Sequence, residues 1–183
     1  MRSAATRLDG PIILEPVVHA DDRGFFLECF REETLADKGI SQRFVQENHS
    51  RSAYGVIRGM HFQADPPMAK LVRCARGAIV DVLVDIRPAS ETFGQWEAYD
   101  LDDRSLRALY VPPGFAHGFC VVSEVADVLY KQSAYWQPGL DRGFALDDPE
   151  VAITWPIPRE AWVVSERDLT APPLGAVVRK SGG

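Results

Sequence analysis

The stretch Ala78-Ile79-Val80-Asp81-Val82-Leu83-Val84-Asp85-Ile86 carries the clearest structural signal in the chain. A period of two is typical of a β-strand, whose successive side chains point to opposite faces of a sheet. Here four β-branched residues occupy every second position and two acidic residues lie between them: Val80, Val82, Val84 and Ile86 against Asp81 and Asp85. We therefore expect a strand with its valine face in the core and its aspartate face at least partly in water.

Short apolar segments separated by Gly, Pro, Asp or Ser recur on both sides of that stretch. This spacing is typical of an all-β sandwich or barrel, in which many short strands are joined by turns. The content of 13 prolines and 14 glycines agrees with it, because neither residue suits a long helix. The segments are residues 12–14, 25–30, 44–45, 56–62, 71–74, 79–86, 96–101, 106–111, 119–122 and 128–136.

Helical signals are confined to two short segments. Residues 31–38 form a charged run that is closed by Gly39, a residue type that commonly ends a helix. Residues 158–162 are a weaker candidate. Residues 169–183 are rich in Pro and Gly and lack periodicity, so we expect an irregular surface tail. The whole chain, residues 1–183, has the length of a single domain.

The bulk composition is that of an ordinary globular protein. The apolar share is 46% and the charged share 25%, and no run of about 18 uncharged apolar residues is present that could cross a bilayer. A net charge of −6 repels nucleic acid and membrane surfaces, so we expect neither as a partner. The first residues include Arg2, Arg7 and Asp9 and no apolar signal sequence, which favours a cytoplasmic protein.

The sequence argues against a metal centre. Cys29, Cys74 and Cys120 are far apart and form no CxxC pair, so we expect buried free thiols rather than disulfides or a thiolate zinc site. Pro112-x-Gly114-x-x-His117 resembles the second motif of the cupin superfamily. A metal-binding cupin also needs a His-x-His pair, because several N and O donors must converge on the ion. The corresponding place reads His61-Phe62-Gln63, and the amide predicts that no metal is bound.

His61 is either a buried histidine that only makes structural hydrogen bonds or a general base. A base that removes a proton from carbon needs three helpers: a carboxylate that fixes its tautomer, a cation for the developing enolate, and a proton donor on the far face. The chain offers Asp168 or Asp81 for the first task, Lys70 for the second and Tyr130 for the third. These neighbours favour the catalytic role.

Three arginines lie beside turn-forming residues and are candidates for gripping a diphosphate: Arg23, Arg58 and Arg167. Strict alternation along one strand would place Arg58 and His61 on opposite faces. Either Gly59 marks a bulge, or Arg58 serves another part of the same cleft.

Two aromatic residues offer planes on which a nucleotide base can stack, namely Trp136 and Phe26. Aromatic side chains in a β-sandwich more often belong to the core, and this alternative stays open for both residues.

An ordered series of motifs covers the chain from about Ile12 to Asp168. In order these are Asp22-Arg23-Gly24-x-Phe26-x-Glu28, Gln46-x-Asn48-x-Ser50, Gly55-Val56-x-Arg58-Gly59-x-His61-x-Gln63, Lys70-Leu71-Val72, Asp81-x-x-x-Asp85-x-Arg87, Ser90-x-Thr92-Phe93-Gly94-x-Trp96, Gly114-Phe115-Ala116-His117-Gly118-Phe119, Tyr130-Lys131, Asp148-Pro149, Ile153-x-Trp155-Pro156 and Ser165-x-Arg167-Asp168. The series strongly resembles the dTDP-4-dehydrorhamnose 3,5-epimerase family.

The resemblance implies a fold, a reaction and a set of site residues. The fold would be a metal-free, cofactor-free cupin jelly roll, a double-stranded β-helix with a few short helices, that works as a homodimer. The reaction would convert dTDP-4-dehydro-6-deoxy-D-glucose into dTDP-4-dehydro-L-rhamnose, with His61 as base paired to Asp168, Tyr130 as acid and Lys70 beside the 4-keto oxygen. Substrate would be bound by Arg23, reaching across from the partner subunit, and by Phe26, Glu28, Gln46, Asn48, Arg58, His117, Trp136 and Arg167.

Other functions remain open. The family often has a tyrosine where this chain has Trp136, with Tyr135 one place earlier, and this position bears on substrate choice. The same catalytic residues would serve an epimerase that inverts only C3 or C5, or one that acts on another nucleotide-linked 4-keto sugar. A metal-dependent cupin oxygenase is disfavoured by Gln63. A non-catalytic sugar-nucleotide binding protein is disfavoured by the complete set of base, acid and lysine.

Overall fold

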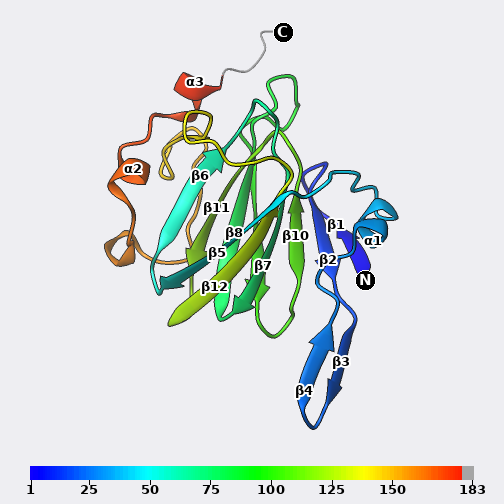
Figure 1. Cartoon of the computed structure of the whole chain (residues 1–183). Coiled ribbons are helices and arrows are strands. Elements are labelled where there is room, and N and C mark those ends of the chain that lie inside the picture. Colours follow the sequence, from blue (N-terminus) through cyan, green and yellow to red (C-terminus); the bar gives the residue numbers. More distant parts are fainter. Residues whose placement is uncertain (179–183) are drawn as a thin grey trace.

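The structure, a computed structural model, describes residues 1–178, and in it two antiparallel sheets face each other (Figure 1). The first contains six strands in the order β1 (Arg2–Ala5), β2 (Ile12–Glu15), β10 (Ala108–Val111), β7 (Lys70–Arg76), β12 (Val125–Gln132) and β5 (Gln46–Ala53). The second contains five, in the order β13 (Arg142–Gly143), β6 (Ile57–Phe62), β11 (Phe115–Val121), β8 (Ala78–Asp85) and β9 (Trp96–Asp102). The predicted all-β jelly roll is confirmed.

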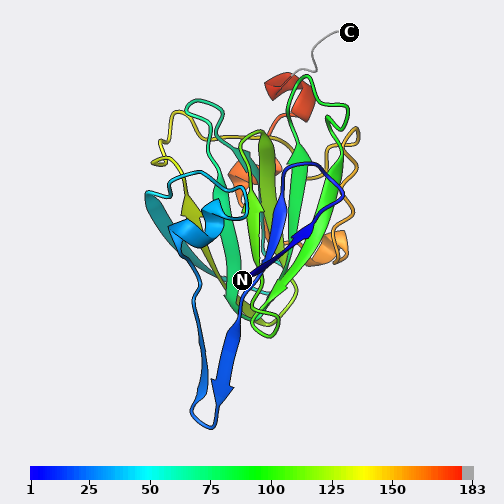
Figure 2. The same ribbon diagram turned by 90° about the vertical axis from the view of Figure 1, so that its right-hand side faces the viewer.

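A separate hairpin extends from the first sheet. It consists of β3 (Val18–Asp21) and β4 (Gly24–Leu27), which among the described residues pair only with each other and project from the body of the molecule (Figures 1 and 2). Two strands alone bury too little surface to be stable in water, so a free hairpin of this kind needs a surface to pack against.

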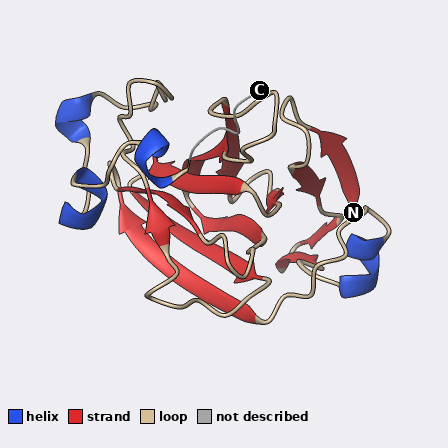
Figure 3. Cartoon of the chain, turned by 90° about the horizontal axis from the view of Figure 1, so that it is seen from above, coloured by secondary structure: helices blue, strands red, loops and turns tan. Residues whose placement is uncertain are grey.

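The helices are short and lie at the periphery, as Figure 3 shows. The first, α1 (Glu32–Ala36), falls within the predicted segment 31–38, and Gly39 follows it with a φ of +81°. A 3₁₀ turn at Arg159–Ala161 occupies the second predicted segment. Two more are α2 (Glu166–Leu169) and α3 (Leu174–Val177). None of the helices in the described part of the chain is long and apolar enough to cross a membrane.

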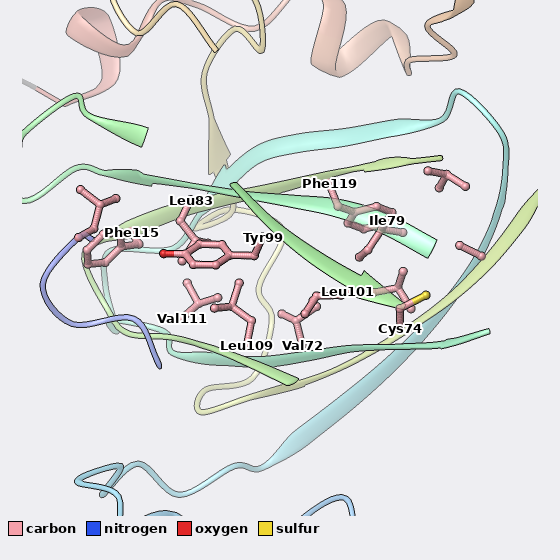
Figure 4. Close-up of a cluster of buried hydrophobic side chains, with 14 residues drawn as sticks. Val72, Cys74, Ile79, Leu83, Tyr99, Leu101, Leu109, Val111, Phe115 and Phe119 are labelled. Carbon is pink, nitrogen blue, oxygen red and sulfur yellow. The ribbon is translucent and has the colours of Figure 1, made fainter. Parts of the chain in front are cut away.

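The aspartate face of β8 is not in contact with water, and the prediction was wrong on this point. Asp81 and Asp85 are both fully buried. Their face of β8 also carries Ile79 and Leu83, which pack against the opposite sheet in the apolar cluster of Figure 4. Val82 and Val84 of the valine face are buried as well and Val80 is partly buried, because the chain after β13 packs over this face.

The C-terminal region is more ordered than an irregular tail. Leu174 in α3 is buried in the second apolar cluster, and its backbone N–H donates to Asp148 Oδ2 at 2.6 Å. Residues 179–183, the end of the predicted tail, lie outside the described residues. The three cysteines are free thiols, of which Cys74 and Cys120 are buried as expected and Cys29 is half-buried.

A bulge in β6 decides which side chains reach the interior. His61 lies opposite His117 on β11, whereas Arg58 lies opposite Phe119, so three steps along β6 match two along β11. Because of the one extra residue in β6, the side chains that follow it point to the face opposite to the one that strict alternation predicts. Arg58 and His61 therefore line the same cleft, as the bulge hypothesis predicts.

At this bulge, position 59 requires glycine, because any other residue would be strained there. Its φ is +150°, and a Cβ added to it would lie 2.7 Å from the Gly118 Cα on β11. Both the backbone conformation and the close approach of the two strands therefore require glycine.

We expect Gly59→Ala to lower the free energy of unfolding by about 3 kcal/mol, since left-handed backbone strain and overpacking each cost roughly 1–3 kcal/mol. Gly39→Ala is the matched control, because Gly39 also has a positive φ but has no heavy atom within 4 Å of the added Cβ. It should cost about 1 kcal/mol from strain alone. Urea unfolding of the three proteins measures both values, and equal losses in the two variants would contradict the close-packed bulge.

Candidate active site

A cleft of about 570 Å³ opens between the two sheets, and chemically active side chains from widely separated parts of the sequence line it. Arg58 and His61 come from β6, Lys70 from β7, His117 from β11 and Tyr130 from β12. The chain around α2 completes the wall with Ser165, Arg167 and Asp168. All four predicted catalytic residues therefore lie in one cleft.

His61 is held by a carboxylate. Its Nε2 lies 2.7 Å from Asp168 Oδ1, and the Asp168 side chain is only 7% exposed. The carboxylate favours the tautomer with the proton on Nε2, which leaves the lone pair of a neutral ring on Nδ1. Of the two carboxylates that the sequence offered for this task, the structure pairs Asp168 with His61.

Asp168 is kept ionised by its hydrogen bonds. Burial alone would raise the pKa of this carboxyl, but hydrogen bonds from His61 and from the Gly59 backbone N–H outweigh it and hold the pKa below its usual range. Ser165 contributes as the N-cap of α2, where its Oγ accepts the Asp168 backbone N–H at 3.2 Å. The charge of Asp168 is thereby available to stabilise a protonated His61.

Asp81 pairs with the other histidine of the cleft. His117 Nε2 lies 2.8 Å from Asp81 Oδ2, and His117 Nδ1 lies 3.4 Å from Lys70 Nζ. Burial lowers the pKa of His117 despite the neighbouring Asp81. Burial likewise lowers the pKa of Lys70 to about 8, against the opposing charges of Asp141 and Asp81. At neutral pH this arrangement consists of a neutral imidazole beside an ammonium group.

Tyr130 reaches the cleft from the sheet opposite to His61. It lies across from Asn48 in the β5–β12 pairing, and its ring packs against the apolar cluster of Figure 4. Burial raises the pKa of its hydroxyl, although Asn48 and Arg58 partly offset that effect. The phenol therefore stays protonated at neutral pH and can act as a proton donor.

Two guanidinium groups give the cleft a positive wall. Arg58 Nε donates to the buried Ser52 Oγ at 3.2 Å, and Arg167 Nη1 donates to Asp141 Oδ2 at 2.8 Å. Arginine at such a place recognises carboxylate or phosphate groups with two parallel hydrogen bonds. An anionic ligand is thus favoured here even though the whole chain is acidic.

Gln46, Asn48 and Trp136 do not line the cleft but form a hydrogen-bonded group at the start of β5, where Asn48 pairs with Tyr130. The Gln46 amide donates to Asn48 Oδ1 at 3.0 Å and accepts the Trp136 backbone N–H at 2.9 Å. Asn48 Nδ2 donates in turn to Gln132 Oε1 at 2.9 Å. The Trp136 side chain is about half exposed, which leaves its ring accessible to a ligand.

The remaining predicted binding residues do not reach the cleft of their own chain. Arg23, Phe26 and Glu28 lie on or just after the β3–β4 hairpin, far from α2 in Figure 1. Arg23 pairs with Asp21, Glu28 pairs with Arg31, and the Phe26 ring is 72% exposed. Within one subunit the structure therefore separates these three residues from the other candidates.

Two serines of the site were not predicted. Ser165 caps the helix that carries Asp168, and the pattern Ser165-x-x-Asp168 is a recognisable helix start. Ser52 is buried and holds Arg58. It follows Gln46, Asn48 and Ser50 at every second position of β5, so the alternation of that strand was an available signal.

The polar residues of the cleft do not form a cluster of metal-ligand type. Across residues 1–178, no group of three or more His, Cys, Asp or Glu side chains is placed to hold a metal ion. Gln63 is buried and donates from Nε2 to the Pro66 carbonyl at 3.3 Å. The Gln63 amide therefore makes a structural hydrogen bond to the backbone.

Comparison with known proteins identifies close relatives. The family model for dTDP-4-dehydrorhamnose 3,5-epimerase matches residues 5–176. The dTDP-4-dehydrorhamnose 3,5-epimerase of Methanothermobacter thermautotrophicus is 44% identical over 174 residues, which cover 94% of each chain. A dTDP-4-dehydrorhamnose 3-epimerase from Streptomyces niveus is 42% identical over 85% of this chain and 76% of its own length.

A solved structure extends the likeness to the whole fold. It is the dTDP-6-deoxy-D-glucose-3,5-epimerase of Legionella pneumophila, in complex with dTDP-4-keto-L-rhamnose. The two chains superpose with a TM-score of 0.93 at 38% identity, and the match covers 100% of this chain and 99% of the other.

Proposed function

The chain belongs to the dTDP-4-dehydrorhamnose 3,5-epimerase family, and from that membership we propose the reaction that it catalyses. It is a cytoplasmic isomerase that inverts C3 and C5 of dTDP-4-dehydro-6-deoxy-D-glucose to give dTDP-4-dehydro-L-rhamnose, a step of dTDP-L-rhamnose biosynthesis, whose product can supply polysaccharide biosynthesis. The observation that carries the proposal is the placement of His61, Asp168, Lys70 and Tyr130 around one cleft.

The chemistry follows from the C4 ketone of the substrate. The ketone acidifies the hydrogens on C3 and C5, and removal of either one gives an enolate whose negative charge lies on the C4 oxygen. His61, oriented by Asp168, takes the proton, and the Lys70 ammonium stabilises the oxygen. Inversion then requires a proton from the opposite face, which Tyr130 supplies.

The strands that carry His61 and Tyr130 support their assignment as base and acid. His61 projects from the five-stranded sheet and Tyr130 from the six-stranded sheet, so the base and the acid reach the cleft from facing walls. A sugar ring held between the walls meets the base on one side and the acid on the other. Two groups on the same wall would return the proton to the face from which it came.

The remaining residues would bind the substrate. Arg58 and Arg167 are the donors suited to a diphosphate, and His117 lies beside Lys70 at the sugar. Gln46 and Asn48 present amides next to Tyr130, and the exposed Trp136 ring offers a plane for the base or sugar.

The active form is a homodimer in which Arg23, Phe26 and Glu28 complete the site of the other subunit. The β3–β4 hairpin exposes Val18, Phe25 and Phe26 and makes few contacts with its own chain. An exposed apolar strand pair of this kind indicates an interaction surface, and a second copy of the chain would cover it.

The direct test of the reaction follows the substrate by proton NMR in deuterated water with a rhamnose-forming reductase to trap the product. We expect deuterium at both C3 and C5 and an L-rhamnose product. Exchange at neither carbon would contradict the proposed activity.

An epimerase that inverts only one centre is the second candidate, because the 42% identical relative from Streptomyces niveus is named a 3-epimerase. The same base, acid and lysine would serve it. In the NMR experiment this enzyme would incorporate deuterium at one carbon only.

His61→Asn should abolish deuterium exchange at both carbons, because the other imidazole that lines the cleft, His117, directs its free nitrogen to Lys70 and cannot replace the base. Binding of dTDP, measured by calorimetry, should change less than about threefold, since the nucleotide does not depend on the base. Exchange in this variant at the wild-type rate would contradict the role of His61.

Tyr130→Phe should separate the two halves of the reaction. Proton removal by His61 survives while delivery from the opposite wall is lost, so epimerisation should fall by about 100-fold or more and exchange by much less. The ratio of the two rates is measured in one NMR time course. An equal loss of both rates would argue against Tyr130 as the acid.

Mixing two inactive variants tests the shared site. If Arg23 serves the partner, a dimer of one His61→Asn subunit and one Arg23→Ala subunit contains one fully wild-type site. We expect the mixture to recover up to half of the wild-type activity per heterodimer after refolding together, while neither variant alone recovers any. If Arg23 served its own chain, every site would carry one substitution and the mixture would stay inactive.

A further inference from the structure

A buried carboxylate behind the cleft has no role in the mechanism derived so far. Asp81 is fully buried on β8, and its contact in the site is His117 Nε2 at 2.8 Å. Its other oxygen, Oδ1, has no hydrogen-bond partner among the described residues. Burying a charge without complete compensation costs stability, so this aspartate is not explained by the needs of folding.

Asp85 shows how the same strand satisfies a buried carboxylate that supports the fold. It lies on the same face of β8 as Asp81 and is equally buried. Four hydrogen bonds from side chains of the following loop reach its oxygens: Arg87 Nε at 2.9 Å, Arg87 Nη2 at 2.7 Å, Ser90 Oγ at 2.6 Å and Thr92 Oγ1 at 2.5 Å. The contrast indicates that Asp81 is present for what it does to His117.

Asp81, His117 and Lys70 form a series of two contacts, and the available donors and acceptors allow only one placement of the His117 ring proton in it. A lysine ammonium can only donate, so His117 Nδ1, at 3.4 Å from Lys70 Nζ, must present its lone pair. The ring proton of the neutral imidazole is then on Nε2 and is donated to Asp81 Oδ2. With the other tautomer, Nδ1–H would point at the ammonium and the two donors would repel each other.

We propose that Asp81 is a positioning residue that, through the tautomer of His117 and through its own charge, keeps the Lys70 ammonium aimed into the cleft and protonated during the reaction. This inference rests on the proposed epimerase function, in which Lys70 stabilises the enolate oxygen. The contacts join the two sheets, because Lys70 belongs to β7 and the other two residues to β11 and β8.

The surroundings of Lys70 explain why its proton needs support. Burial lowers the pKa of Lys70 to about 8, and the charges of Asp141 and Asp81 are what hold it that high. A sugar that fills the cleft would remove further water from the ammonium. The other titratable or charged groups that face Lys70 or His117 across the cleft are Arg58, His61, Tyr130, Arg167 and Asp168.

The pH profile of Asp81→Asn tests the proposal. The negative charge of Asp81 raises the pKa of Lys70, so its removal lowers that pKa, and the alkaline limb of the kcat profile should move down by about one pH unit. At pH 8 we expect kcat to fall about 5-fold, because the protonated fraction of Lys70 drops from about one half to about one tenth, with little change in KM, since the lost interaction acts on the transition state. The acidic limb, which does not depend on the Lys70 ammonium, should stay in place.

Two observations separate this role from a structural one. Asp81→Asn should unfold at the same temperature as the wild type or higher, because it removes a poorly compensated buried charge. Tyr99→Phe is the matched control: Tyr99 lies opposite Asp81 on β9, its buried hydroxyl has no partner within residues 1–178, and its loss changes no charge. It should leave both limbs unmoved. An unchanged alkaline limb in Asp81→Asn would overturn the proposal.

Nitrogen-15 NMR of the ligand-free protein tests the series of contacts from Asp81 through His117 to Lys70 without any turnover. The chain has 4 histidines, so comparison with His117→Gln identifies the His117 signals. We expect the Nε2–H tautomer in the wild type and a lower titration midpoint for Lys70 in Asp81→Asn. The Nδ1–H tautomer in the wild type would overturn the proposal that Asp81 acts on Lys70 through His117. Failure of the epimerase assay with these NMR results intact would refute the proposed function alone.

Discussion

The hydrogen bond between His61 and Asp168 connects residues 107 positions apart, and the cleft depends on the chain path that makes it possible. After β13 the chain turns back across β6, where Val163 bridges Val56 in parallel and exchanges hydrogen bonds with Gly55 and Ile57 at 2.9 and 3.1 Å. This short pairing fixes the start of the segment that leads to α2. The C-terminal region is therefore part of the site rather than an appendage of the sheets.

Much of the fold could be predicted because strand alternation depends on local sequence. The pattern of β8 located the strand and assigned the correct side chains to each face. It failed on the environment of the aspartate face, because alternation says which residues share a face and not what covers it. Asp81 is covered by a histidine 36 positions away, and Asp85 by three residues of its own loop. Only the second of these arrangements is visible locally.

The residue types of the candidate site could be predicted from the sequence, but its geometry could be predicted less well. The motifs supplied His61, Lys70, Tyr130 and Asp168, and the structure brings all four into one cleft. Which carboxylate pairs with which histidine could not be read from the chain, since it depends on the register of β6, β11 and β8. For the same reason the sequence could not show to which face of β6 the Arg58 side chain points, because that depends on the extra residue in β6 at Gly59.

The two-sheet architecture also accounts for the cost that the site imposes on the fold. Facing walls can place an acid and a base on opposite sides of a ligand only if both walls carry polar groups into an interior that is otherwise apolar. In that interior each charge loses its hydration, which is why burial lowers the pKa of both Lys70 and His117. Fixed partners replace the lost water at His61 and His117, but at Lys70 the compensation is incomplete. In the proposed reaction that deficit would favour the enolate, because an ammonium with few other partners gains most when negative charge develops beside it.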